Sequence, residues 1–159
     1  MKLIVINGSK NSKKGLLAHR LSNNSDCIWI KPYCDKSVEV NSDPVDDKFI
    51  YLNEKQLESK IDNEVILAET VVNGNRYVFF ENQLNADYIV LIGDDRIVSY
   101  LKSNYGGQLV TVRCHSESEE YSQRSILPDK EFDIVYNYDS DDFDNFVFEI
   151  EDINDYQVN

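Results

Sequence analysis

A short, unbroken apolar strand opens the chain and runs directly into a glycine-bearing polar loop. Lys2–Ile6 reads KLIVI, and such a run of β-branched residues suits a strand that is buried on both faces of a sheet. The polar loop Asn7–Gly15 follows, and Leu16–Leu21 can then begin a helix. Strand, loop and helix in this order are the opening of a P-loop fold. This opening therefore predicts an α/β protein with a phosphate-binding loop near its N-terminus.

Further strand-like and helix-like segments alternate along the rest of the chain. Short β-branched or aromatic runs predict strands at Cys27–Ile30, Phe49–Leu52, Tyr88–Ile92, Leu109–Arg113 and Phe132–Asn137. One helix is expected after Asn53, with Gln56 at the capping-box position, and another over Ser116–Gln123, with Ser116 as its N-cap. Two more are expected from Arg96 to about Ser103 and over Asp141–Ile150. Asn73-Gly74 lies between two more strand-like runs and predicts a hairpin within Glu64–Phe80.

This alternation predicts one α/β domain, built on a mostly parallel sheet with helices on both faces. The length of 159 residues fits a single domain. Ligands in such folds bind beyond the carboxyl ends of the strands. The loops after Ile6 and Ile92 lie at those ends. The second loop carries Asp94 and Asp95, which either cap the following helix or position a metal ion or substrate.

Charge is distributed unevenly along the chain. The net charge is −13, yet residues 1–36 carry +5 (seven Lys or Arg against two Asp) and residues 129–159 carry −10 (one Lys against eleven acidic residues). An acidic protein is a poor partner for nucleic acid, so nucleic-acid binding is not expected. The basic first segment leaves room for a phosphate site, and the acidic end is expected to be a solvated surface.

Membrane, disulfide and metal signals are missing from the sequence. No apolar run can span a bilayer and no secretory cleavage pattern is visible, so a cytoplasmic protein without a membrane partner is expected. Cys27, Cys34 and Cys114 have no CxxC spacing and are expected to be reduced and buried; a bridge between the first two would need the fold to bring them close. His19 and His115 lack partners at metal-site spacing, and no metal site is predicted.

Several segments, in sequence order, resemble guanylate kinases. Residues 4–16 read IVINGSKNSKKGL and are similar to the family's P-loop, Gly-x-Ser-Gly-x-Gly-Lys-(Gly/Ser)-Thr. Similar stretches follow at Tyr51–Ile61, Ile66–Tyr77, Asp87–Asp94 and Glu131–Asn137. The resemblance spans about residues 2–150. It implies a mostly parallel, P-loop NTPase-like sheet flanked by helices. It also implies a small β-rich insertion at about 33–85, like the family's nucleoside-monophosphate-binding region, followed by a shortened lid at 124–131 and a ragged end at 151–159.

The resemblance places phosphate binding in one loop, made of Gly8, Ser9, Lys10, Asn11, Ser12, Lys13, Lys14 and Gly15. Glycines matter there because a backbone without Cβ lets N–H groups approach phosphates, while the lysine reaches the outer phosphates. Gly8 and Lys14 match the pattern. Asn11 and Lys13 replace two glycines, and Leu16 replaces the hydroxyl that helps to hold Mg²⁺. The three lysines of the loop form either a phosphate cradle or a lysine-rich surface.

The resemblance also implies that the substrate pocket has lost recognition residues. The family's paired arginines correspond to Lys36 and Glu39, and the glutamate would repel a phosphate. Phe49 stands where the family has a phosphate-binding tyrosine, and Ala68 stands where it has the guanine-reading glutamate. Glu69 is the next residue along the strand, so alternation would point it to the opposite face.

Three further residues bear on activity. Tyr77 and Asp94 match the family, although Tyr77 also fits an ordinary half-buried hairpin aromatic. Arg124 is the arginine that remains in the shortened lid. An arginine at the transition state can be worth about 10³–10⁵ in rate, so the loss of others would be expensive. In an active enzyme, Lys14 and Arg124 would be the catalytic residues.

These departures leave two functions open. The leading hypothesis is a catalytically defective guanylate kinase-like module that binds an unidentified protein partner, or else a phosphate or nucleotide, without catalysis. The alternative is an active ATP-dependent kinase of nucleoside or deoxynucleoside monophosphates with altered specificity. ATP and Mg²⁺ are the expected cofactors if nucleotide binding is retained, and no cofactor is expected otherwise.

Overall fold

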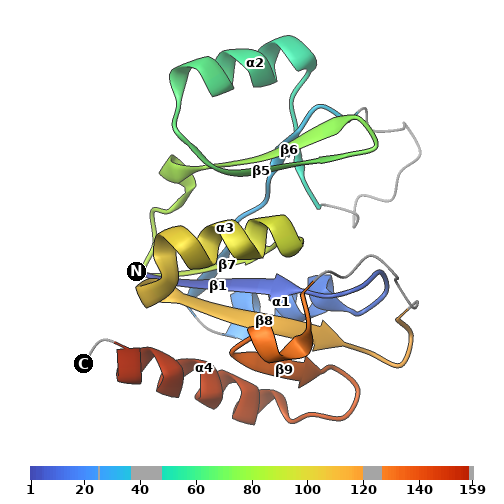
Figure 1. Cartoon of the computed structure of the whole chain (residues 1–159), viewed down its shortest axis with the longest axis vertical. Helices are drawn as coiled ribbons and strands as arrows, with labels where there is room; N and C mark the ends of the chain where they lie inside the picture. The colour runs from blue at the N-terminus through green and yellow to red at the C-terminus, as the bar shows by residue number, and fades with distance from the viewer. Residues whose placement is uncertain (25, 37–47, 120–126, 158–159) are drawn as a thin grey trace. The chain divides into compact units, whose positions relative to one another are not determined.

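The chain folds as two compact units in the computed structural model, which describes residues 1–24, 26–36, 48–119 and 127–157 (Figure 1). The first unit comprises Met1–Trp29 and Ala86–Asn159, and the second comprises Ile30–Asn85. The second unit interrupts the first along the sequence. The β-rich insertion expected at 33–85 lies within this second unit.

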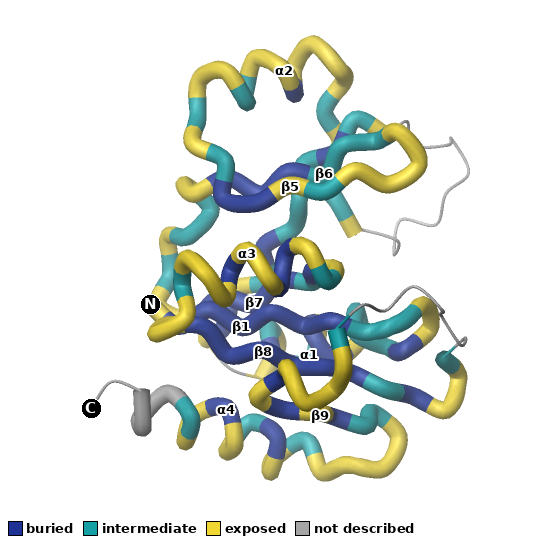
Figure 2. Tube along the Cα trace, viewed as in Figure 1, coloured by how far each residue is buried: buried dark blue, intermediate teal, exposed yellow. Residues whose placement is uncertain are grey.

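A five-stranded parallel sheet forms the centre of the first unit. Its strands are β1 (Lys2–Asn7), β2 (Cys27–Trp29), β7 (Tyr88–Ile92), β8 (Leu109–His115) and β9 (Ile134–Asn137), in the order β2-β7-β1-β8-β9. All neighbouring pairs are parallel, and Ile4 of β1 is in register with Val90 on one side and Val110 on the other. The central strand β1 is buried along its whole length, as its unbroken apolar run predicted (Figure 2).

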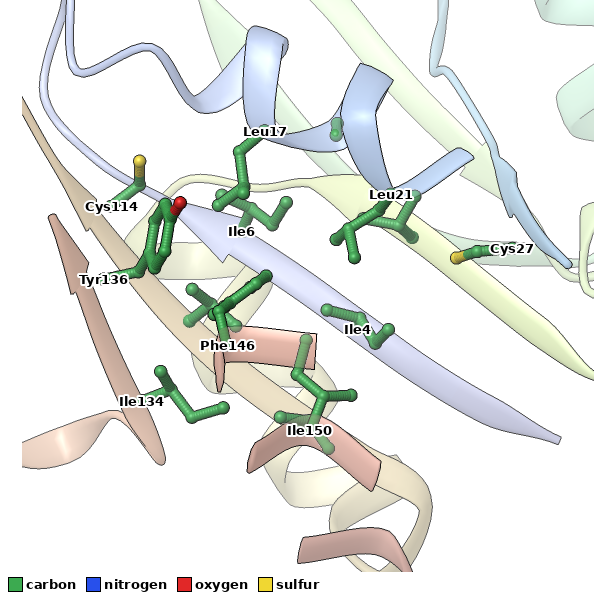
Figure 3. Close-up of a cluster of buried hydrophobic side chains, with 14 residues drawn as sticks. Ile4, Ile6, Leu17, Leu21, Cys27, Cys114, Ile134, Tyr136, Phe146 and Ile150 are labelled. Atoms are coloured by element: carbon green, nitrogen blue, oxygen red, sulfur yellow. The ribbon is translucent and has the colours of Figure 1, made fainter. Parts of the chain in front are cut away.

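Helices cover both faces of this sheet. On one face, α1 (Lys14–Asn24) and α4 (Phe143–Gln157) share a buried cluster with the strands, to which Leu17 and Phe146 contribute (Figure 3). Alternation along β1 directs Leu3 and Val5 to the other face, where α3 (Asp95–Tyr105) packs. Two short 3₁₀ segments, η2 (Gly106–Gln108) and η3 (Asp129–Glu131), precede β8 and β9. The carboxyl ends of β7, β1 and β8 therefore lie side by side at one edge.

Two helices differ from the sequence prediction. Residues 116–119 form a turn rather than the first turn of a helix; in it the Ser116 hydroxyl donates to Asp139 at 2.7 Å and accepts from the Ser118 backbone at 3.3 Å. Residues 120–123 of that predicted helix lie outside the described residues. The last helix, α4, continues to Gln157 instead of ending at Ile150, so residues 151–157 are helical and not ragged. Ile153 packs against the buried cluster and explains the extension.

The second unit is a four-stranded sheet with one helix. Its strands are β3 (Tyr33–Cys34), β4 (Ile50–Tyr51), β5 (Ile66–Val72) and β6 (Asn75–Phe80), in the order β4-β3-β6-β5, followed by η1 (Glu81–Gln83). Strands β5 and β6 are antiparallel and form the predicted hairpin. Asn73 and Gly74 at its tip have φ values of 52° and 80°, the positive pair that a tight hairpin turn of this kind requires.

Helix α2 (Glu54–Asn63) covers one face of this second sheet. It begins with the predicted capping box, in which the Asn53 side chain accepts from the Gln56 backbone and the Gln56 side chain accepts from the Asn53 backbone. Leu57 of α2 is buried with Val78 and Phe80 of β6. This small core stabilises the second unit.

The three cysteines are free and buried, as predicted. Cys27 lies in the first unit and Cys34 in the second, and neither forms the bridge that the sequence left open. Within the described ranges, no helix combines the length and the apolar character that a membrane crossing needs.

Candidate phosphate-binding site

The loop between β1 and α1 packs closely against its surroundings at Gly8. A Cβ added to Gly8 would lie 2.4 Å from the Ser12 hydroxyl and 2.7 Å from the Cys114 carbonyl oxygen, so glycine is required there. The Cys114 thiol donates to the Ser12 carbonyl at 3.2 Å and supports the loop from β8. Burial raises the pKa of this thiol to about 12, so it stays protonated and can donate.

Two residues of this loop have left-handed backbones without being glycine. Asn11 has a φ of 65° and Lys13 a φ of 64°, and these are the positions at which the guanylate kinase pattern has glycine. The residues beside them, Ser12 and Lys14, do not have positive φ. Alternating backbone conformations of this kind point successive N–H groups to one side and form an anion-binding concavity. The loop therefore has positive φ at the two positions where the guanylate kinase pattern has glycine.

The lysines of the loop have different environments. Lys14 begins α1, and its Nζ donates to the carbonyls of Gly8 and Ser9 at 3.1 and 3.2 Å, so its side chain lies across the loop. Lys10 is exposed. Lys13 forms an ion pair with Asp139 at 2.7 Å, with its Nζ 5.2 Å from the centre of the Tyr138 ring. The three lysine side chains therefore lie in three different environments.

Residues 16 and 94 occupy the two positions that bear on Mg²⁺ binding. The Leu16 side chain, at the position of the family's hydroxyl, is 51% exposed and has no oxygen to offer. Asp94 caps α3 by accepting from the Ile97 backbone at 3.0 Å, which favours the capping role left open by the sequence. In the part of the chain that the structure describes, no group of three or more His, Cys, Asp or Glu residues is arranged to hold a metal ion. Leu16 therefore supplies no ligand for Mg²⁺, and the helix cap occupies one carboxylate oxygen of Asp94.

A cluster of polar side chains, with Asn7 and Arg113 buried, lies at the carboxyl ends of β1, β7 and β8. The Asn7 side chain donates to the Gly93 carbonyl at 2.9 Å and to Asp95 at 3.1 Å. The Arg113 side chain is 7% exposed, lies 3.7 Å from Asp95 and donates to the Leu127 carbonyl at 2.7 Å. Neither Asn7 nor Arg113 was predicted as a site residue. Both lie at the carboxyl ends of predicted buried strands, where ligands bind in such folds, and this position could have identified them from the sequence.

Acidic and hydroxyl side chains from outside the loop hold it at alternate residues. The Ser9 hydroxyl donates to Glu119 at 2.8 Å, and the Ser118 hydroxyl donates to the Asn11 carbonyl at 3.1 Å. Lys13 pairs with Asp139, as described above. We call Ser116, Ser118, Glu119 and Asp139 the acidic collar. None of them was predicted as a site residue.

Asp139 is the most strongly held member of the collar. Besides Lys13, it accepts from the Ser116 hydroxyl and from the Glu117 backbone, both at 2.7 Å. The Lys13 hydrogen bond, followed by those from Glu117 and Ser116, lowers the pKa of Asp139 to about 2. The same pairing raises the pKa of Lys13. The ion pair is therefore fully charged at neutral pH.

His115 lies beside the collar and contacts two carboxylates. Its Nδ1 is 3.1 Å from Glu119, and its Nε2 is 3.2 Å from Asp129. The sequence predicted an ordinary histidine at this position. In the structure it links the collar to η3. His19, by contrast, lies on α1 and contacts Asn23 at 2.9 Å.

The residues predicted to line a substrate pocket lie in the second unit, apart from Asp94. Lys36 is exposed, and Tyr77 is partly buried with its ring edge-on to Phe49. Ala68 is 5% exposed, whereas Glu69 is exposed and pairs with Arg76 at 2.7 Å. The alternation predicted for these two residues is therefore confirmed. Glu39 and Arg124, together with the lid range 124–126, lie outside the described residues.

The parallel sheet, its flanking helices and the loop after β1 define a P-loop NTPase-like α/β fold. More particularly, the fold is guanylate kinase-like. The crystal structure of guanylate kinase from Anaplasma phagocytophilum is similar to this chain, with a TM-score of 0.68 and 14% identity, over 98% of this chain and 85% of that one. No protein-family model matches the sequence, and no curated protein sequence matches it. The shared fold does not by itself transfer an activity.

Proposed function

We propose that this protein is a guanylate kinase-like domain that binds a phosphate-bearing ligand at residues 8–15 and does not transfer phosphoryl groups. The observation that carries the proposal is the left-handed backbone of Asn11 and Lys13. A non-glycine residue in this conformation costs about 1–2 kcal/mol, asparagine being the better tolerated of the two. Strained backbone of this kind is retained mainly at sites that bind or react with a ligand.

The loss of transfer is supported by what surrounds the loop. Phosphoryl transfer depends on metal ions and cationic side chains that neutralise the charge on the moving group. Leu16 offers no metal ligand, Asp94 is engaged as a helix cap, and Lys13 is neutralised by Asp139. The carboxylate of Glu119 adds negative charge near Ser9. These groups oppose a polyphosphate approaching its transition state.

The second unit supports the same conclusion for the acceptor nucleotide. Ala68 has no carboxylate with which to read a guanine, and Glu69 is paired with Arg76 on the surface. Phe49 stacks edge-on against Tyr77 without a hydroxyl of its own. Guanine recognition by this set of residues is therefore not expected.

Two measurements test the proposal. In a coupled assay with ATP, Mg²⁺ and each nucleoside or deoxynucleoside monophosphate in turn, we expect ADP formation at the background rate. In calorimetry with ATP, GTP and inorganic tripolyphosphate, we expect binding that is weakened in Lys14→Ala. The alternative of an active kinase, which would use Lys14, Asp94 and Arg124, requires robust ADP formation with at least one monophosphate, and that result would overturn the proposal.

A protein-binding domain is the second candidate function. It is favoured by the internal engagement of the loop, because Ser9, Asn11 and Lys13 all contact the acidic collar. A loop committed to such contacts can persist as scaffold alone. This candidate predicts no binding of any phosphate compound in calorimetry, so the same titration separates the two functions.

A further inference from the structure

Lys13, a cation of the loop, is engaged in an ion pair with Asp139. Lys13 Nζ lies 2.7 Å from Asp139, and the two side chains are 33% and 21% exposed. An incoming phosphate at the loop would meet the carboxylate together with the lysine. Since like charges at short range repel, Asp139 opposes the ligand that the loop backbone would attract.

Asp139 reaches the loop from a distant part of the sequence and is held in place there. It follows β9, and its backbone N–H donates to the Asn137 side chain at 3.1 Å. Its carboxylate also accepts from Ser116 and from the Glu117 backbone. These contacts fix the carboxylate against the loop independently of Lys13. Asp139 is therefore a built-in feature of the fold rather than a surface side chain that happens to lie near a lysine.

Charged groups of both signs surround this pair. Lys14 lies on the loop itself and Glu117 and Glu119 lie on the turn after β8, while the Arg20 guanidinium is 5.8 Å from the centre of the Tyr138 ring that Lys13 also contacts. Glu117 and Asp139 both add to the raised pKa of Lys13, which shows that the lysine lies in a negative field. The cation is thus neutralised by the protein before any ligand arrives.

We propose that the Asp139 carboxylate is an autoinhibitory group, which competes with a phosphate ligand for Lys13 and keeps the loop in a low-affinity state. The inference rests on the proposed phosphate binding at residues 8–15. Tight binding then requires the ion pair to open, either by displacement or by a change at residues 116–119 that releases Asp139. The ligand class is defined by its phosphate group, whether free or part of a nucleotide.

Titration of inorganic tripolyphosphate into the intact chain, without Mg²⁺, tests the inference. Asp139→Asn removes the charge and keeps an acceptor for Ser116, and it is expected to tighten binding by about fivefold or more, the effect of one unit charge at about 4 Å in water. Glu149→Gln makes the same charge change at an exposed position of α4 and is expected to alter binding by less than about twofold. Adding Lys13→Ala to Asp139→Asn is expected to abolish the gain.

The outcomes separate the inference from the function on which it rests. If Asp139→Asn binds tripolyphosphate no more tightly than the unmutated chain does, the autoinhibitory role is overturned and phosphate binding is left intact. An equal gain in Glu149→Gln does the same, because a general charge effect would then explain it. Binding by none of the proteins overturns both proposals. Asp139→Ser serves as a second neutral variant, with the fluorescence of Trp29 reporting that each variant is folded.

Discussion

Replacing Lys13 by glycine and, separately, by alanine measures the backbone strain of the phosphate loop. Both variants lose the contacts with Asp139 and Tyr138, so the difference between them reports the backbone alone. The left-handed φ of 64° costs a non-glycine residue about 1–2 kcal/mol. Glycine lowers the folding stability by about 0.4–1 kcal/mol relative to alanine, because its unfolded chain has greater conformational freedom. Lys13→Gly is therefore expected to be more stable than Lys13→Ala by about 0.8 kcal/mol.

The assay is urea unfolding followed by the fluorescence of Trp29, which is the single tryptophan and packs against the core of the first unit. Lys10 provides the matched control, because it is an exposed lysine of the same loop without a positive φ. There the order is expected to reverse, with Lys10→Ala more stable than Lys10→Gly by about 0.4–1 kcal/mol. If alanine is the more stable residue at both positions, the loop does not have the left-handed backbone on which the proposed function depends.

Three further predictions concern the first unit. Leu17→Ala is expected to destabilise by about 2–5 kcal/mol because Leu17 is fully buried, whereas Leu16→Ala, at an exposed neighbour, is expected to change unfolding by less than about 0.5 kcal/mol in the same urea experiment. The pKa of Asp139 is lowered from 3.8 to about 2, so its contribution to stability is present above about pH 4 and is lost as the pH falls towards 2. Acid titrations should therefore show that the stability difference between the unmutated chain and Asp139→Asn shrinks over that window. A difference that does not vary with pH would contradict the pairing. Burial raises the pKa of Cys27 to about 11 and that of Cys114 to about 12, so a thiol reagent at about pH 8 should label neither in the native protein and both in urea, as counted by mass spectrometry.

Local patterns were sufficient to predict most of the fold. The apolar run of β1, the Asn73-Gly74 turn and the capping box at Asn53 each depend on neighbouring residues, and the structure contains all three. The helix predicted from Ser116 is a turn over residues 116–119, where the Ser116 hydroxyl bonds to Asp139, far along the sequence, as well as accepting from the Ser118 backbone. Capping rules cannot anticipate such a long-range competitor.

The candidate site was only half predictable for the same reason. Gly8 and Lys14 follow from the motif and lie in the loop as expected. The collar residues Glu119 and Asp139 reach the loop through parallel crossover connections, so their distance in sequence hides their proximity. The left-handed Lys13 was also hidden, because a lysine gives no local signal for a backbone conformation that glycine favours.

Mapping of backbone amide NMR signals during an ATP titration tests the central claim most directly. The account predicts that the largest shifts fall on the amides of residues 8–14, with ³¹P spectra of the same sample showing no ADP after Mg²⁺ and a nucleoside monophosphate are added. Shifts confined to other parts of the chain, or the appearance of ADP above the protein-free control, would contradict it.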